Sequence, residues 1–84
     1  MYEVVITPHA ERELKRLDRS VKNRIMPIAL ALANDPRPRG CLKIKGEEHR
    51  WRIRVGDWRI GYEINEETRT VRIVTIGHRR EFYD

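Results

Sequence analysis

The feature that most constrains the fold is the stretch Arg50–Ile64, which reads RWRIRVGDWRIGYEI. Arginines and apolar residues alternate on both sides of Gly56-Asp57, a dipeptide typical of the two-residue turns that join antiparallel strands. Counting outward from this turn predicts the register of a hairpin. The predicted pairs are Val55 with Trp58, Arg54 with Arg59, Ile53 with Ile60, Arg52 with Gly61, Trp51 with Tyr62 and Arg50 with Glu63.

Side chains alternate across a strand, so these pairs fall on two opposite faces of the hairpin. The apolar face, which we expect helices to cover, carries Val55, Trp58, Ile53, Ile60, Trp51 and Tyr62. The basic face, which we expect to be bare, carries Arg50, Arg52, Arg54 and Arg59, with Gly61 open beside them. Like charges directly opposite one another destabilise a sheet, so the Arg54/Arg59 pair indicates an anion-binding site. A solvated face of a basic protein is the alternative reading.

The composition favours a polyanionic partner. The chain has 84 residues, which we assign to a single domain (1–84), and its 18 Lys and Arg against 13 Asp and Glu give a net charge of +5. Nucleic acid and an acidic protein both fit this surplus. One cysteine and three scattered histidines offer no disulfide and no metal-ligand spacing, so no metal and no cofactor are expected. Without a signal peptide or a long apolar run, we expect a cytoplasmic protein and no membrane contact.

The other elements follow from local signals. Thr7-Pro8 is a helix start, with Thr7 as the cap and Pro8 in the first turn. Apolar spacing predicts a second helix from Asp18–Ser20 to about Ala33, which Pro27 should kink or restart. The predicted segments are a strand at Met1–Thr7, helices at Pro8–Leu17 and up to Ala33, a short strand or extended loop at Cys41–Lys45, and a strand at Arg69–Ile76.

This order predicts an α+β fold. Two N-terminal helices pack on one face of a small curled, mainly antiparallel sheet, which we expect to have four strands. The other face is left to the arginines. Arginine presents a fork of donors that matches phosphate oxygens, and RNA carries its own nucleophile, the 2′-hydroxyl. Candidate RNA-binding residues near the hairpin and in the tail are Lys43, Lys45, Arg50, His78 and Arg80.

The run LKIKG…WRIRVGDWRIGYEI…VTIGHRREFYD, after a strand, two helices and a Pro-Arg-Pro loop, resembles the RelE/ParE superfamily of bacterial and archaeal toxins, and most closely its RelE branch. The resemblance covers essentially the whole chain. RelE toxins cleave messenger RNA in the ribosomal A site, without a metal, by attack of the 2′-hydroxyl on the neighbouring phosphodiester. The resemblance therefore implies an endoribonuclease whose partners are the ribosome, mRNA and a RelB-like antitoxin with an acidic toxin-binding segment.

Carried over by position, the catalytic residues implied by the resemblance are Arg52, Arg54, Arg59, Arg79 and Tyr83. In well-studied RelE enzymes the hairpin's two basic residues are lysines, whereas here both are arginines, which stay protonated. Proton removal would then fall to Tyr83, His78, Glu81 or water. The alternative within the superfamily is a ParE-like toxin that inhibits DNA gyrase by binding, with the arginines as contacts.

Overall fold

A computed structural model describes residues 1–81 of the chain. Its elements in chain order are β1 (Glu3–Ile6), α1 (Pro8–Lys15), α2 (Arg19–Ala31), β2 (Leu42–Lys43), β3 (Arg50–Val55), β4 (Trp58–Asn65), β5 (Thr70–His78) and the short 3-10 helix η1 (Arg79–Glu81). The predicted α+β class is confirmed.

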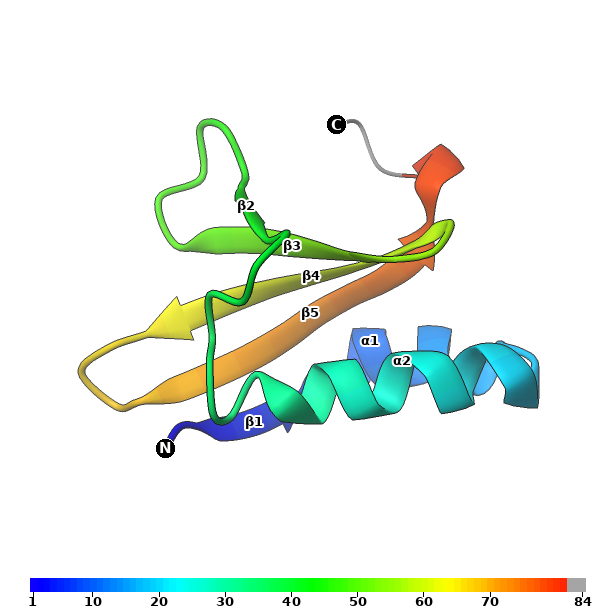
Figure 1. Ribbon diagram of the computed structural model, residues 1–84, viewed down its shortest axis with the longest axis horizontal. Coiled ribbons are helices and arrows are strands. Elements are labelled where there is room, and N and C mark those ends of the chain that lie inside the picture. Colours follow the sequence, from blue (N-terminus) through cyan, green and yellow to red (C-terminus); the bar gives the residue numbers. More distant parts are fainter. Residues whose placement is uncertain (82–84) are drawn as a thin grey trace.

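The strands form one sheet in the order β1-β5-β4-β3-β2, shown in Figure 1. The sheet therefore has five strands, and the prediction of four was wrong. The additional strand is β2, where Leu42 and Lys43 pair with Arg52 and Trp51 at the edge of the hairpin. A two-residue strand is too short to leave a periodic pattern in the sequence. β1 pairs with β5 in parallel, and the remaining neighbours are antiparallel.

The helix starts follow the predicted chemistry. The Thr7 hydroxyl accepts a hydrogen bond from the Ala10 N–H at 3.2 Å, and Pro8 occupies the first turn. The second helix runs from Arg19 to Ala31 without interruption, so of the predicted kink or restart at Pro27 the restart does not occur. Pro27 is exposed, and because it has no N–H the Asn23 carbonyl lacks the usual donor four residues on.

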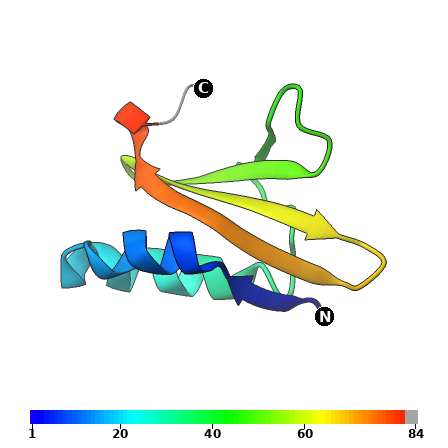
Figure 2. The ribbon, with the colours of Figure 1, turned by 180° about the vertical axis from the view of Figure 1, so that it is seen from behind.

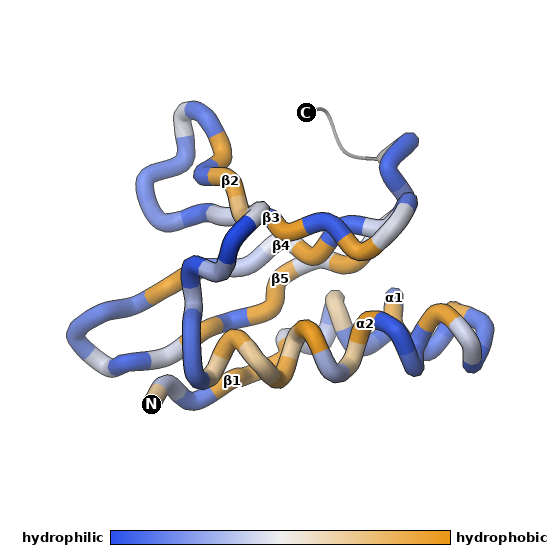
Figure 3. The backbone as a smooth tube through the Cα atoms, viewed as in Figure 1, coloured by the Kyte–Doolittle hydropathy of each residue, from blue (hydrophilic) through white to orange (hydrophobic). Residues whose placement is uncertain are grey.

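Both helices lie against the same face of the sheet, as the front and back views show (Figures 1 and 2). Hydrophobic positions follow the helices and the central strands, whereas the loop after β4 is hydrophilic (Figure 3). The buried core between the layers consists of Ala10, Ile25, Ala29, Leu32, Ile53, Val55, Ile60, Tyr62, Ile64, Val71, Ile73 and Ile76. The apolar hairpin face is thus covered by the helices, as predicted.

The hairpin register matches the sequence prediction at every pair from Val55↔Trp58 to Arg50↔Glu63. Gly56 has a φ of +62°, a conformation that disfavours residues with a Cβ, and this explains the glycine in the turn.

The last strand is longer than the predicted Arg69–Ile76 and includes His78. Between Gly61 and Tyr62 the pairing with β5 shifts, because Gly61 lies opposite Thr75 whereas Tyr62 lies opposite Ile73. Val74 is therefore an extra residue, a β-bulge that turns both Ile73 and Ile76 towards the core. The bulge explains why β5 is apolar at both even and odd positions.

Candidate functional site

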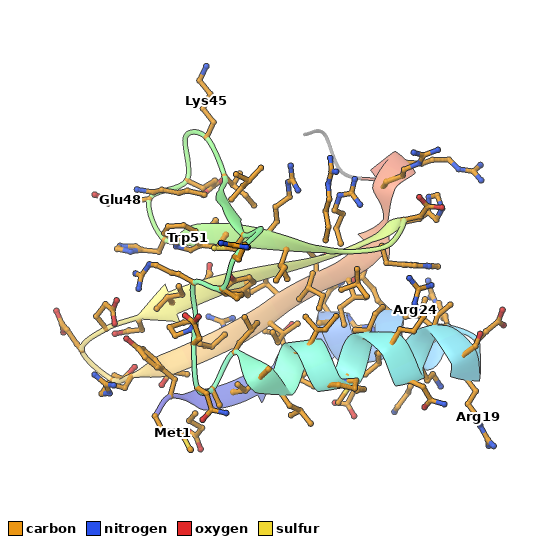
Figure 4. All side chains as sticks on the ribbon, viewed as in Figure 1. Met1, Arg19, Arg24, Lys45, Glu48 and Trp51 are labelled. Carbon is orange, nitrogen blue, oxygen red and sulfur yellow. The ribbon has the colours of Figure 1, made fainter. Side chains whose placement is uncertain are left out.

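The basic face of the hairpin continues across three strands in rows that the register sets. Counted from the hairpin turn, the rows are Arg54–Arg59–Gly77, Arg52–Gly61–Thr75 and Arg50–Glu63–Arg72. Figure 4 shows nitrogen-tipped side chains gathered on this side of the hairpin, away from the helices. In the first two rows a glycine stands beside an arginine, so no neighbouring side chain crowds the guanidinium from that strand.

The central carboxylate of the third row pairs with both of its arginines and compensates one of their two charges. Arg50 Nε lies 3.0 Å from Glu63 Oε2, and Arg72 Nη1 lies 3.5 Å from Glu63 Oε1. Arg50, a predicted RNA contact, is therefore already engaged in an ion pair. The remaining arginines of this face lie towards the hairpin turn.

The two arginines at the centre of the face are buried, and the expectation of a bare face was wrong for them. Arg59 is 4% exposed and Arg52 is 8% exposed. Arg59 lies back over the turn, where its Nη1 donates to the carbonyls of Gly56 at 3.4 Å and Trp58 at 3.3 Å. Arginine is rarely this buried, and burial of its charge requires hydrogen-bonding partners. The Arg59 guanidinium is therefore held in place by the backbone around the turn, and both side chains are shielded from solvent.

Two further predicted residues meet at the turn end of the face. Arg54 is exposed and lies opposite Arg59. Arg79 begins η1, where its backbone N–H donates to the carbonyl of Asp57 at 2.7 Å and its Nε lies 3.8 Å from the Asp57 carboxylate. The structure thus brings Arg52, Arg54, Arg59 and Arg79 to one end of the sheet.

Four predicted RNA contacts lie elsewhere or only at the margin. Lys43 pairs with Trp51, and His78 pairs with Trp58, so the register places both on the face opposite the arginines. The His78 ring meets the Trp58 ring edge-on at 5.3 Å, and its Nδ1 accepts from the Arg80 N–H at 3.4 Å. Lys45 projects outward from the loop after β2 (Figure 4), and Arg80 is exposed on η1. The predicted Tyr83 lies outside the described residues.

Two acidic residues of the site were not predicted as such. Glu63 compensates Arg50 and Arg72, and the hairpin register, which pairs it with Arg50, could have indicated this role. Asp57 contacts Arg79 through its backbone and its carboxylate. Nothing in the sequence signals that contact, because it depends on where η1 begins relative to the turn.

A hollow of about 660 Å³ includes Glu63 and Arg72 of the third row, but none of the arginines at the turn end. It lies at the opposite end of the hairpin and is lined in part by Arg37, Lys43, Trp51 and Glu66. Arg37 lies over the Trp51 ring at 5.1 Å and 2.9 Å from the Glu66 carboxylate. The Tyr2 hydroxyl donates to Glu66, and this bond together with Arg37 lowers the pKa of the Glu66 carboxyl. These contacts connect Tyr2, the loop between α2 and β2, and the loop after β4 at this end of the molecule.

A second hollow, of about 490 Å³, lies between α2 and β3 and is lined mainly by apolar side chains such as Ile28, Leu32 and Ile53, with Arg54 at its margin. Nowhere among residues 1–81 do three His, Cys, Asp or Glu side chains come close enough together to hold a metal ion. No helix in the described part of the chain has the length and apolarity that a membrane crossing requires.

Comparison with known proteins identifies the family. Residues 4–83 match the family described as the ParE toxin of type II toxin-antitoxin system, parDE. The chain belongs to this family, within the RelE/ParE toxin superfamily. The RelE/ParE chain is also 50% identical over 42 residues to Toxin RelE3 of Methanocaldococcus jannaschii. That alignment covers 50% of this chain and 46% of the relative.

Solved structures place the RelE/ParE chain among RelE toxins. It superposes on the archaeal RelE–RelB complex of Pyrococcus horikoshii with a TM-score of 0.81 and 25% identity, over 93% of this chain and 94% of the other. RelBE2 of Mycobacterium tuberculosis, a toxin–antitoxin complex, gives 0.80 and 28% identity over 92% and 96%. The RelB–RelE complex of Methanococcus jannaschii gives 0.76 and 28% over 95% of each chain. The resemblance to RelE toxins drawn from the sequence is confirmed.

Proposed function

We propose that this chain is a RelE-type endoribonuclease that cleaves messenger RNA in the ribosomal A site and arrests growth. Its site is the turn end of the basic face, where Arg52, Arg54, Arg59 and Arg79 meet. The observation that carries the proposal is the burial of Arg59 at 4% exposure between two turn carbonyls. A solvated strand face does not require a guanidinium that backbone carbonyls hold in place, whereas a phosphate-binding site benefits from one.

The arrangement suits catalysis because the charges are fixed before the substrate arrives. Paired positions in adjacent strands lie about 5 Å apart, so the exposed Arg54 can reach the non-bridging oxygens of a phosphate while the buried Arg59 beside it contributes a fixed positive charge. Fixed donors stabilise charge that develops on phosphorus without having to reorganise, and removal of one such donor typically lowers the rate about 100- to 1,000-fold. Arg79, anchored to Asp57, approaches from the neighbouring strand.

The reaction that this site serves is transesterification within the RNA. The 2′-oxygen forms a bond to the adjacent phosphorus while the bond from phosphorus to the 5′-oxygen breaks, which gives a 2′,3′-cyclic phosphate and a 5′-hydroxyl. The 2′-hydroxyl loses its proton and the departing 5′-oxygen gains one. Because the nucleophile belongs to the substrate, the protein has only to align it, neutralise the phosphate and transfer protons.

Proton removal does not fall to the arginines, which stay protonated. His78 lies on the opposite face and its Nδ1 already accepts from Arg80. We therefore assign the general base to Tyr83, Glu81 or water, and keep Lys45 and Arg80 as peripheral RNA contacts.

The proposed partners follow from the relatives. The archaeal and mycobacterial toxins that this chain resembles were solved as complexes with their antitoxins. The net charge of +5 suits an antitoxin whose toxin-binding segment is acidic, and we place the toxin, its antitoxin and the ribosome together in the cytoplasm.

The test is primer extension on a defined message in programmed ribosomes. We expect a ribosome-dependent break in the A-site codon with the wild type and a loss of about 100-fold or more in Arg54→Ala, Arg59→Ala and Arg79→Ala. Arg72→Ala is the matched control, because Arg72 is an arginine of the same face that already pairs with Glu63. Circular dichroism establishes that each variant is folded, and this matters most for the buried Arg59.

A different outcome would favour the alternative, a ParE-like toxin that inhibits DNA gyrase by binding. If the folded wild type arrests growth but leaves the message intact, and a gyrase supercoiling assay is inhibited, the arginine face is a binding surface and not a nuclease site. The likeness to named RelE toxins favours the nuclease.

A further inference from the structure

The tip of the hairpin is contacted from the helix layer by an arginine that belongs to neither strand. A Cβ placed on Gly56 would lie 2.3 Å from Nη2, 3.3 Å from Cζ and 3.6 Å from Nη1 of Arg24. The guanidinium of Arg24 therefore rests against the Cα of Gly56. Figure 4 shows Arg24 reaching from α2 towards the tip, whereas Arg19 of the same helix points away.

The same tip holds two arginines of the proposed site. Arg59 Nη1 donates to the carbonyls of Gly56 and Trp58 from the basic face. The Arg79 N–H donates to the carbonyl of Asp57 from η1, at 2.7 Å. The turn and Trp58 thus carry the acceptors for the Arg59 guanidinium and for the Arg79 backbone, so the position of the tip affects where both residues lie.

From this geometry we infer that Arg24 is a positioning residue for the reaction, which fixes the hairpin tip from the helix side and thereby fixes Arg59 and Arg79. The inference rests on the proposed nuclease function for its kinetic part only. Arg24 lies on the helix-covered side of the hairpin, so it acts through the turn backbone and not on the phosphate.

The φ of +62° is the reason for glycine at position 56, because a Cβ there would displace only the far end of the flexible Arg24 side chain. The close approach nevertheless shows that the Arg24 guanidinium lies directly against the turn. Without the Arg24 side chain, the tip would lose this contact with α2 while its bonds to Arg59 and Arg79 remained. The tip then moves together with Arg59 and Arg79. Displacements well below 1 Å are enough to slow a reaction that depends on the alignment of the reacting groups.

The structural part of the test is amide hydrogen exchange. The exchange rate of the Arg79 amide reports directly on its bond to Asp57, and we expect it to rise about tenfold in Arg24→Ala. The Thr7 amide, which donates to the Ile73 carbonyl at 3.0 Å in the β1–β5 pairing, should be unchanged. Arg19→Ala removes the same charge from the same helix and should alter neither amide.

The kinetic part uses single-turnover cleavage in programmed ribosomes at increasing toxin concentration. We expect Arg24→Ala to lower the maximal cleavage rate about tenfold with little change in the half-saturating concentration. Arg24→Lys should be nearly as slow, because lysine keeps the charge but not the planar group that rests on Gly56. Arg19→Ala should cleave as the wild type does.

Three results would overturn the inference. The first is an unchanged Arg79 amide in Arg24→Ala, and the second is equal acceleration of the Arg79 and Thr7 amides, which would mean general destabilisation. The third is a change confined to half-saturation that Arg24→Lys rescues, because that would make Arg24 a direct RNA contact. If the wild type cleaves no message, the nuclease proposal fails and the two exchange measurements alone decide the role of Arg24.

Discussion

Tyr62 shows how one buried polar group fixes a loop to the sheet. Its ring is fully buried, and its hydroxyl donates to the carbonyl of Pro36 at 2.8 Å. Pro36 precedes Arg37, whose guanidinium lies over Trp51. The connection from α2 to β2 is therefore held against the core by this hydroxyl and against the hairpin by a cation–π contact. The alternation pattern places residue 62 on the apolar face of the hairpin, but it does not predict that its side chain needs a hydroxyl group.

Tyr62 also makes stability depend on alkaline pH. Burial raises the pKa of its hydroxyl above the usual 10.0. Above pH 10 the unfolded chain therefore releases a proton that the folded chain keeps, so stability is complete below pH 10 and falls as the pH rises further, by up to about 1.4 kcal/mol per pH unit. In Tyr62→Phe we expect this decline to be shallower, with about 1 kcal/mol lost at pH 8 for the missing hydrogen bond.

Urea unfolding of both proteins at pH 8 and pH 11 measures the difference. The same decline in free energy in Tyr62→Phe would show that other groups cause the alkaline loss. Tyr2→Phe is a useful comparison, because the Tyr2 hydroxyl is bonded to Glu66 near the surface instead of within the core.

At the scale of elements, Glu13 of α1 protects the part of β5 that β1 does not reach. β1 pairs with β5 only as far as Ile73. Beyond it, Glu13 Oε1 accepts from the Ile76 N–H at 2.8 Å and from the Thr75 hydroxyl at 3.0 Å. A side chain thus replaces the missing strand at an edge that would otherwise be open to pairing with another chain.

We expect Glu13→Ala to lower the free energy of unfolding by about 2 kcal/mol, since hydrogen bonds to charged groups contribute about 1.5–3 kcal/mol. Glu13→Gln keeps an oxygen acceptor and should lose less than half of that. Chemical denaturation at pH 7 measures both variants. Equal stability of the alanine and glutamine variants would mean that the carboxylate does not secure the edge of β5.

Whereas Glu13 stabilises the fold, we expect Pro27 in α2 to lower the free energy of unfolding. An interior proline is about 3 kcal/mol less favourable in a helix than alanine. Because Pro27 is exposed, replacing it removes no core contact. We expect Pro27→Ala to raise the unfolding free energy by about 1–3 kcal/mol in thermal or urea unfolding. A lower midpoint would mean that the chain depends on the bend or the stiffness that proline provides.

At the scale of the whole molecule, the basic face is compensated unevenly. Glu63 pairs with Arg50 and Arg72 at one end of this face, whereas Arg54 and Arg59 lie opposite each other at the turn end. A site that holds a phosphodiester should also bind inorganic phosphate. We expect phosphate to raise the melting temperature more than chloride does at equal ionic strength. At a phosphate concentration ten times its dissociation constant, the unfolding free energy should increase by about 1.4 kcal/mol.

Arg54→Ala should reduce this additional stabilisation by phosphate, and Arg72→Ala should leave it intact. Both variants remove one exposed arginine from the same face, so general screening by salt affects them alike. Differential scanning calorimetry in the two buffers measures the effect. An identical response to phosphate and chloride in the wild type would argue against an anion site at the turn end.

Much of this architecture could be predicted because its signals are local. The hairpin register follows from a two-residue turn and strict alternation, and each predicted pair from Val55↔Trp58 outward was confirmed. The cap at Thr7 was equally local. β2 was not predicted as a fifth strand, because two residues carry no period.

The details of the site could not be predicted because they arise from contacts between distant segments. Arg59 is buried because the turn carbonyls accept from it, which alternation alone does not show. His78 was expected among the arginines, but β5 continues through it and its pairing with Trp58 places it on the other face. The contact of Arg24 with Gly56 requires the packing of α2 against the hairpin.

The parallel pairing of β1 with β5 also determines when the sheet can form during synthesis of the chain. β5 lies between β1 and β4, although it is the last strand of the sheet to be synthesised. Until it emerges from the ribosome, β1 has no partner, β4 has an open edge, and the rows of the basic face lack Gly77 and Thr75. Pairings between segments so distant in sequence also form slowly. A nascent chain therefore carries no assembled site until β5 has been synthesised, and the proposed cleavage can begin only after all five strands have left the ribosome.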